Sequence, residues 1–325
     1  MKTYDRIYVL STLDNDDWFV TQNIMETLGD HIEYIDVVHF SNGETNVEIH
    51  ANGLNKVLLT ARLDLYEKPN EFIMNIIFAA DCLKRQGVSV DLFIPCLPYA
   101  RQDRKNGRDV ALTSSVVLKM FENYFDKIYV MDLHAPQLEG YISKPLVNLN
   151  PDPLFLEAIR QEIKKHNYKT FSEDWKWVVV SPDAGGVKRA KRFADALGLP
   201  IAIIHKTRDP ITNKSVSHTL IGDVEGKNCI IVDDMIDSGG TLVDANNMLK
   251  EKGAKEVLIT ISHGVLSKPN DHLSDLKGYV LNTVVDDFVR LLTVNPVKNI
   301  KIIRIEEYFL EKIIGVKMFD SDFGA

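Results

Sequence analysis

The sequence predicts an α/β protein with two similar domains, each a mostly parallel β-sheet flanked by helices. Three observations predict this class. Short runs of β-branched and apolar residues recur along the chain, and amphipathic segments of helical length separate them. Near-continuous apolar strands that alternate with helices are typical of a parallel sheet covered on both faces. The length of 325 residues favours two domains, because a domain usually has roughly 150 residues.

The expected strands are short runs in which valine, isoleucine and leucine predominate. They are Ile7–Leu10, Val57–Thr60, Val88–Ile94, Ile128–Met131, Trp177–Val180, Ile201–Ile204, Cys229–Val232 and Val257–Ile261. Between them, apolar residues recur at the spacing of a helix face that packs on a sheet. The expected helices are Asn70–Arg85, Thr113–Tyr124, Pro153–Lys165, Val187–Leu197, Leu242–Lys252 and Glu306–Ile314. Gly87 and Gly253 closely follow two of them, as is usual at a helix C-terminus.

Prolines mark the expected boundary between the domains. Pro145, Pro151 and Pro153 lie where the apolar pattern is weakest, and proline interrupts helices and central strands. We therefore expect an N-terminal α/β domain over residues 1–149 and a C-terminal one over residues 150–325. This division leaves open that the last helix packs back on the N-terminal domain.

The composition excludes several classes of protein. Hydrophobic residues make up 45% of the chain and charged residues 26%, which excludes a disordered or collagen-like protein. The net charge of −8 argues against a nucleic-acid partner, because phosphate backbones attract positive surfaces. There is no CxxC pair, no signal peptide and no apolar run near the roughly 20 residues of a membrane helix. We expect a cytoplasmic protein that has reduced thiols and no membrane partner.

The most informative segment leads from an apolar strand into carboxylates and glycines, Val232-Asp-Asp-Met-Ile-Asp-Ser-Gly-Gly-Thr241. Backbone N–H groups in a glycine-bearing turn before a helix can hold a phosphate, and nearby hydroxyls add donors. Asp233, Asp234 and Asp237 place three like charges within five residues, which is reasonable where they face sugar hydroxyls or a divalent cation. The segment predicts a sugar-phosphate site. A solvated acidic turn with a helix cap is the alternative.

Two further segments have residues that can bind anions. Asp183-Ala-Gly-Gly186 is another glycine-bearing turn between an expected strand and an expected helix, so it is a second candidate anion cradle. A tight turn capped by the aspartate is the alternative. Arg101, Arg104 and Lys105 bring three cations into five residues of an acidic chain, which indicates a polyphosphate ligand. An ordinary solvated loop is the alternative.

Three more residues have a functional and an ordinary interpretation. Lys206 and Arg208 follow the expected strand Ile201–Ile204 and open a polar stretch typical of a mobile loop. Considered alone, they are better explained as two ordinary surface cations. His134 follows the expected strand Ile128–Met131, and a lone histidine is more often structural than a ligand.

Taken together, the motifs resemble those of a known family. The run Val232–Thr241 resembles the phosphoribosyl pyrophosphate motif that type I phosphoribosyltransferases and ribose-phosphate pyrophosphokinases share. Four segments resemble the ribose-phosphate pyrophosphokinases specifically, in that family's order and spacing. They are Phe40-Ser-Asn-Gly-Glu44, Pro98-Tyr-Ala-Arg-Gln-Asp-Arg-Lys105, Met131-Asp-Leu-His-Ala-Pro-Gln137 and Val180-Ser-Pro-Asp-Ala-Gly-Gly186. The resemblance implies two domains of the type I phosphoribosyltransferase kind.

The resemblance also implies an activity and its residues. The activity is Mg²⁺-dependent transfer of the β,γ-diphosphoryl group of ATP to O1 of ribose 5-phosphate. The implied catalytic residues are Lys206, Arg208 and His134, and the implied Mg²⁺ ligands are His134 and Asp183. The implied ATP-binding residues are Phe40, Asn42, Glu44, Arg101, Gln102 and Asp103. The implied ribose 5-phosphate residues are Asp233, Asp234, Asp237, Ser238, Gly239, Gly240 and Thr241, and the implied pyrophosphate loop is Asp183, Ala184, Gly185 and Gly186.

Two departures and two rival interpretations accompany this resemblance. Asn42 stands where the family usually has aspartate, and Thr207 interrupts a usual Lys-Arg-Arg triplet. A phosphoribosyltransferase needs one α/β unit, which would leave the motifs before residue 150 unexplained. A catalytically silent regulatory relative would be expected to lack the implied catalytic residues, yet they are present. The resemblance further implies a homo-oligomer built on dimers, with a hexamer as one form.

Overall fold

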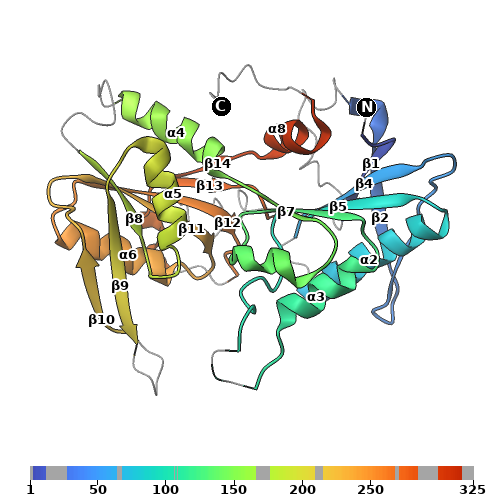
Figure 1. Ribbon diagram of the computed structural model, residues 1–325, viewed down its shortest axis with the longest axis horizontal. Coiled ribbons are helices and arrows are strands. Elements are labelled where there is room, and N and C mark those ends of the chain that lie inside the picture. Colours follow the sequence, from blue (N-terminus) through green and yellow to red (C-terminus); the bar gives the residue numbers. More distant parts are fainter. Residues whose placement is uncertain are drawn as a thin grey trace. The chain divides into compact units, whose positions relative to one another are not determined.

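The computed structural model describes residues 3–11, 28–63, 68–105, 107, 109–165, 176–208, 215–267, 271–284 and 299–316 (Figure 1). These residues form two compact units, and the chain passes from the first to the second between Asn150 and Pro151. The described residues 283–284 and 304–316 return to the first unit. No described helix is both long enough and apolar enough to span a bilayer.

The described part of the first unit contains a seven-stranded sheet. Its strands are β1 (Arg6–Ser11), β2 (Ile32–His39), β3 (Thr45–Val47), β4 (Lys56–Ala61), β5 (Ser89–Phe93), β6 (Lys127–Met131) and β7 (Leu146–Leu149). Their order across the sheet is β3-β2-β1-β4-β5-β6-β7. β3 pairs antiparallel with β2, and the other described neighbours are parallel. The central strands are buried along most of their length, as a sheet covered on both faces requires.

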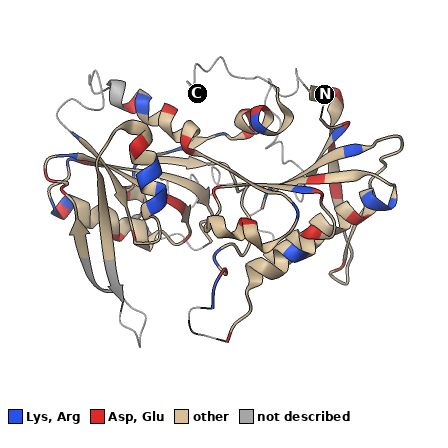
Figure 2. Cartoon of the chain, in the orientation of Figure 1, with Lys and Arg blue, Asp and Glu red and all other residues tan. Residues whose placement is uncertain are grey.

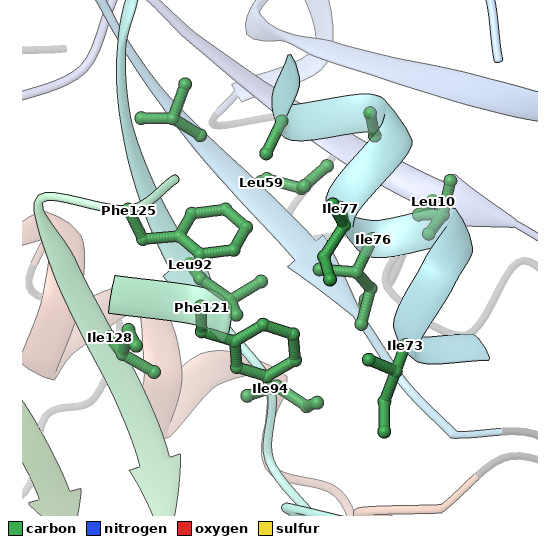
Figure 3. Close-up of a cluster of buried hydrophobic side chains, with 14 of the residues drawn as sticks. Leu10, Leu59, Ile73, Ile76, Ile77, Leu92, Ile94, Phe121, Phe125 and Ile128 are labelled. Carbon is green, nitrogen blue, oxygen red and sulfur yellow. The ribbon is translucent and has the colours of Figure 1, made fainter. Parts of the chain in front are cut away.

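Helices cover this sheet and complete its core. They are α2 (Pro69–Arg85), α3 (Thr113–Glu122) and α8 (Glu306–Phe309), with short turns at Gly29–His31, Pro136–Tyr141 and Leu310–Ile314. α2 turns the buried Ile73, Ile76 and Ile77 toward strand residues such as Leu59, at the spacing of one helix face (Figure 3). The phenyl ring of Phe309 in α8 stacks on that of Phe93 in β5, with centroids 4.2 Å apart.

The described part of the second unit also contains a seven-stranded sheet. Its strands are β8 (Trp177–Ser181), β9 (Ile201–Arg208), β10 (Ser215–Ile221), β11 (Asn228–Ile236), β12 (Glu256–Gly264), β13 (Gly278–Leu281) and β14 (Ile300–Ile303). The accompanying helices are α4 (Asp152–Lys165), α5 (Val187–Leu197) and α6 (Gly240–Glu251), with a short turn at Asp271–Asp275. The strand order is β10-β9-β8-β11-β12-β13-β14, and among the described pairs β10 with β9 is antiparallel.

The two sheets share one topology. In each described sheet the first strand of the unit lies third from one edge, and an antiparallel strand forms that edge. β1, β2, β3 and β4 thus correspond to β8, β9, β10 and β11. The prediction of an α/β protein with two similar, mostly parallel, helix-flanked domains is confirmed.

The differences from the predicted elements lie at strand ends and among polar strands. β9 and β11 are longer than expected, because they continue through charged residues to Arg208 and Ile236. β2, β3, β7, β10, β13 and β14 were not expected, because they are short or carry many polar residues. α6 begins two residues before the expected helix, so Thr241 belongs to its first turn.

Candidate active site

In the second unit, two glycine-bearing loops lie at the point where the strand order reverses. β8 and β11 are parallel neighbours, and the strands that follow them in the chain, β9 and β12, lie on opposite sides of this pair. The loop ending at Gly186 follows β8, and the loop ending at Gly239 follows β11. Ligands of open α/β sheets bind outside the carboxyl ends of the strands at such a reversal. The topology therefore brings the two predicted anion loops to the same edge of one sheet.

The loop after β8 is shaped by short contacts around Asp183. Oδ1 of Asp183 accepts a hydrogen bond from the backbone N–H of Gly186 at 2.9 Å, and the Ser181 hydroxyl donates to the Asp183 carbonyl at 2.7 Å. A Cβ atom at Gly186 would lie 3.1 Å from the Ser181 hydroxyl oxygen. The glycine thus lets the loop close tightly, immediately before α5 begins at Val187. This geometry suits backbone donors and a helix N-terminus that face an anion.

The acidic pair lies within β11, not after it. Asp233 pairs in register with Ile261 of β12, so the strand carries both carboxylates beyond its last pairing with β8. The backbone N–H of Asp234 donates to Oδ1 of Asp233 at 2.9 Å. Asp234 is 4% exposed, and Nη1 of Arg189 on α5 lies 3.2 Å from its Oδ1. Sequence reasoning missed Arg189, although a cation in the first turn of a helix is an unusual signal.

Burial and the neighbouring carboxylate of Asp234 raise the pKa of Asp233 well above its ordinary value, while Arg189 acts in the opposite direction. The native protein therefore holds the proton of Asp233 more strongly than the unfolded chain does. Stability then decreases as the pH rises above the carboxylate's ordinary pKa, because the buried charge must form. The ionised pair thus lowers the stability of the ligand-free protein. Such a loss is common at functional sites that need a charge.

We expect Asp233→Asn to raise the melting temperature at pH 8. The amide keeps an oxygen that can accept the Asp234 N–H, and it removes the buried charge. The gain should decrease toward pH 4, where the native Asp233 is protonated. Thermal unfolding followed by circular dichroism at both pH values measures this difference. Equal melting temperatures at pH 8 would contradict the raised pKa.

The loop after β11 is held by Asp237 and by a left-handed glycine. Oδ1 of Asp237 accepts hydrogen bonds from the backbone N–H of Ser267, at 3.2 Å, and from the Ser267 hydroxyl. Gly239 has φ +80° at the start of α6, and a Cβ atom there would overlap Cδ2 of Leu273. The side chains of Ser238 and Thr241 are exposed. The loop thus presents hydroxyls and helix N-terminal N–H groups together, as a phosphate site requires.

Lys206 and Arg208 do not lie in a loop after β9. Both belong to β9 itself, which pairs antiparallel with β10 and places Lys206 opposite His218 and Arg208 opposite Ser215. The expectation of a mobile loop at these positions is therefore wrong, because pairing with β10 extends the strand through the cations. Their side chains, and residues 209–214, lie outside the described part of the structure. Their proposed role in catalysis stays a prediction.

In the first unit, Phe40, Asn42 and Glu44 form one tight turn. The backbone N–H of Gly43 donates to the Phe40 carbonyl, and Gly43 has φ +87°. Nδ2 of Asn42 donates to Oε2 of Glu44 at 2.9 Å, and the Glu44 N–H donates to Oδ1 of Asn42 at 3.1 Å. The Phe40 side chain is half exposed. The turn therefore presents an aromatic face beside a fixed amide and carboxylate, a combination that can recognise a planar base.

The basic loop of the first unit is exposed at its cations and anchored through its backbone. The Tyr141 hydroxyl donates to the Asp103 carbonyl at 2.7 Å, and the Ser114 hydroxyl donates to the Gln102 carbonyl at 3.0 Å. The carboxylate of Asp103 accepts from Nε of Arg104 at 3.1 Å. Arg101 is exposed. This anchored loop can present its basic residues to a polyphosphate.

The predicted Mg²⁺ ligands come from different units. His134 follows β6 in the first unit, and Asp183 follows β8 in the second. Within the described part of the chain, no three His, Cys, Asp or Glu side chains form a cluster that could hold a metal ion. A carboxylate oriented by the Gly186 N–H is a chemically suitable Mg²⁺ ligand, since Mg²⁺ takes few protein ligands and keeps several waters. The metal assignment stays a prediction.

Comparison with known proteins agrees with these features. Residues 10–124 match the family model for the N-terminal domain of ribose phosphate pyrophosphokinase, and residues 147–291 match that of the phosphoribosyl transferase domain. A ribose-phosphate pyrophosphokinase of Ralstonia nicotianae is 41% identical over 71% of this chain and 70% of its own length. One from Clostridium acetobutylicum is 36% identical over 86% of this chain and 88% of its own.

A solved structure resembles the whole fold. The phosphoribosylpyrophosphate synthetase of Mycobacterium smegmatis superposes with a TM-score of 0.79 at 28% sequence identity, over 95% of this chain and 98% of that one. Family models of both domains match this chain, the N-terminal one first. The identities to curated relatives extend over more than two thirds of both chains. The chain belongs to the ribose-phosphate pyrophosphokinase family of enzymes.

Proposed function

We propose that this protein transfers the β,γ-diphosphoryl group of ATP to O1 of ribose 5-phosphate, giving phosphoribosyl pyrophosphate and AMP. The observation that carries the proposal is the pair of glycine-bearing loops beside the Asp233–Asp234 pair, at the reversal point of the second sheet. One loop suits the 5-phosphate, the other suits the pyrophosphate, and the acidic pair suits the ribose hydroxyls between them.

In this proposal the second unit orients the sugar. The loop from Asp237 to Thr241 binds the 5-phosphate through backbone N–H groups and two exposed hydroxyls. Asp233 and Asp234 accept hydrogen bonds from the sugar hydroxyls, which directs the anomeric hydroxyl toward the β-phosphorus. A bond forms between O1 and that phosphorus as the bond to the AMP oxygen breaks, and the hydroxyl proton passes to solvent. Correct orientation is a large part of catalysis in phosphoryl transfer.

The charges around the transferred group are proposed to come from Lys206, Arg208 and Arg101. Preorganised cations stabilise the negative charge of the transition state without reorganising at the moment of reaction. Mg²⁺, held by His134 and Asp183, would neutralise charge on the nucleotide phosphates when bound. Asp183, Ala184, Gly185 and Gly186 would hold the pyrophosphate part of the product.

The nucleotide is proposed to bind the turn and the basic loop of the first unit. Phe40 would stack on the adenine, while Asn42 and Glu44 offer donor and acceptor groups to its edge. Arg101, Gln102 and Asp103 would contact the ribose and phosphates from the anchored loop.

Location and assembly complete the proposal. We propose a cytoplasmic homo-oligomer built on dimers. The three cysteines, Cys82, Cys96 and Cys229, all lie in the described part of the chain and form no disulfide, which is compatible with a reducing compartment. Light scattering tests the assembly, and a fully active monomer would contradict it.

We expect ³¹P NMR of the purified protein with ATP, ribose 5-phosphate and Mg²⁺ to show AMP and a sugar that carries a pyrophosphate at C1. Both signals should depend on ribose 5-phosphate, because the sugar is the acceptor. AMP formation in its absence would contradict the acceptor assignment. ATP that stays intact with and without inorganic phosphate would instead support a silent regulatory relative, whereas turnover of supplied phosphoribosyl pyrophosphate with a base would support a phosphoribosyltransferase.

A further inference from the structure

Arg189 lies in a position that normally disfavours a cation. It is the third residue of α5, whose first turn contains no acidic residue. Figure 2 shows that basic residues gather along this helix. Because the N-terminus of a helix carries partial positive charge, a basic residue in the first turn is unfavourable unless another group compensates. The side chain of Arg189 is also only 11% exposed, so it needs such a group nearby.

The compensating groups are the carboxylates of β11. Nη1 of Arg189 lies 3.2 Å from Oδ1 of Asp234 and 3.9 Å from Oδ1 of Asp233. The side chain of Asp234 is 6% exposed and that of Asp233 is 15% exposed. Two buried carboxylates beside one another repel, and a shared guanidinium offsets that repulsion. Arg189 therefore opposes both the separation of the two acids and the uptake of a proton by Asp233.

Asp233 and Asp234 differ in their burial and in their contacts. Asp234 is the more buried and the closer to Arg189. The contacts of Asp233 with Arg189 and with the Asp234 N–H both use Oδ1. Within the described residues, Oδ2 of Asp233 takes part in neither contact and can accept a hydrogen bond from a sugar hydroxyl. Asp234 anchors the pair, and Asp233 presents an oxygen to the ligand.

We propose that Arg189 is a positioning residue, which holds the Asp233–Asp234 pair in the arrangement that binds the hydroxyls of ribose 5-phosphate. This inference rests on the proposed function of the pair. Arg189 also connects the two loops of the site, since α5 begins at the end of the Asp183–Gly186 loop and β11 leads into the sugar-phosphate loop. Its effect should therefore fall on sugar binding more than on the chemical step.

The chain offers a matched control on the same helix. Arg192 lies three residues after Arg189 and donates from Nε and Nη2 to Asp152, at 2.6 and 2.9 Å. Asp152 is the first residue of α4 and lies outside both loops. Arg192→Ala thus removes an arginine with a carboxylate partner from α5 without touching the acidic pair. Arg189→Lys keeps a charge but loses the planar guanidinium.

The test compares Arg189→Ala, Arg189→Lys and Arg192→Ala with the unmodified protein. Steady-state rates at saturating ATP and Mg²⁺ give KM for ribose 5-phosphate and kcat, while calorimetric titration with ribose 5-phosphate alone gives binding without turnover. We expect Arg189→Ala to raise KM and the sugar dissociation constant about tenfold or more, with a smaller change in kcat. Arg189→Lys should recover part of the loss, and Arg192→Ala should leave both constants near those of the unmodified protein.

Other results would overturn the inference. A loss confined to kcat would place Arg189 with the transferred group, and equal losses in Arg189→Ala and Arg192→Ala would show a general effect of α5. If the unmodified protein makes no phosphoribosyl pyrophosphate, the proposed function fails. In that case the calorimetric titration still tests the positioning role of Arg189. Weaker sugar binding by Arg189→Ala than by Arg192→Ala supports that role, and equal or absent binding contradicts it.

Discussion

Lys206→Ala is expected to lower kcat for phosphoribosyl pyrophosphate formation by on the order of 10² or more, which is the usual effect of removing one preorganised transition-state donor. KM for ribose 5-phosphate should change much less, because the sugar is proposed to bind the Asp233–Asp234 pair and the loop after β11. The pairing of β9 with β10 supports this expectation: it fixes the backbone at position 206 before substrate arrives. A backbone that is already paired needs little reorganisation during the reaction.

Two control variants distinguish a catalytic role of the Lys206 charge from a general effect of removing a positive charge. Lys250→Ala removes a lysine from the last turn of α6, in the same unit, and should leave kcat unchanged. Lys206→Arg keeps the charge with a different shape and should retain more activity than alanine. The measurement is kcat of each variant at saturating ATP, ribose 5-phosphate and Mg²⁺. An unchanged kcat in Lys206→Ala would remove this lysine from the mechanism.

The sequence predicted the two glycine-bearing loops of the candidate site because the signals for them are local. An apolar strand followed by glycines and then a helix is recognisable within ten residues, and both loops of the second unit have this form. Parallel strands bring their carboxyl ends to the same edge, so the strand order then gathers the loops. Asp183 and Gly239 could be identified for the same reason, since the cap and the left-handed turn are set by neighbouring residues.

What the sequence did not predict depends on contacts between distant residues. Arg189 has a role in the candidate site because α5 packs beside β11, and Asp234 lies 45 positions further along the chain. Lys206 and Arg208 were expected in a loop because polar residues surround them, yet pairing with β10 supplies the hydrogen bonds that extend β9. β2 carries exposed polar positions, so its apolar signal is weak, although β1 fixes it in register. Tertiary pairing outweighs local propensity in these cases.

Gly239→Ala is expected to raise KM for ribose 5-phosphate by about two orders of magnitude, comparable with a displacement of ~1 Å in a positioned site, and to lower the melting temperature. The substitution has two separate costs. A residue with a Cβ atom at φ +80° is strained by roughly 1–2 kcal/mol, and that Cβ atom would overlap Cδ2 of Leu273. The loop that carries Ser238 and Thr241 must move to relieve the overlap.

A double variant separates these two costs. Leu273→Ala removes the atom that the new Cβ would meet, but as a buried residue it should itself destabilise the fold by about 2–5 kcal/mol. In the Gly239→Ala/Leu273→Ala protein the losses should therefore be smaller than the sum of the single losses, with part of the sugar affinity restored. A thermodynamic cycle from thermal unfolding and KM measures the coupling. Strictly additive losses in the double variant would mean that backbone strain alone determines the requirement for glycine. An unchanged KM for ribose 5-phosphate in Gly239→Ala would remove this loop from the sugar-phosphate site.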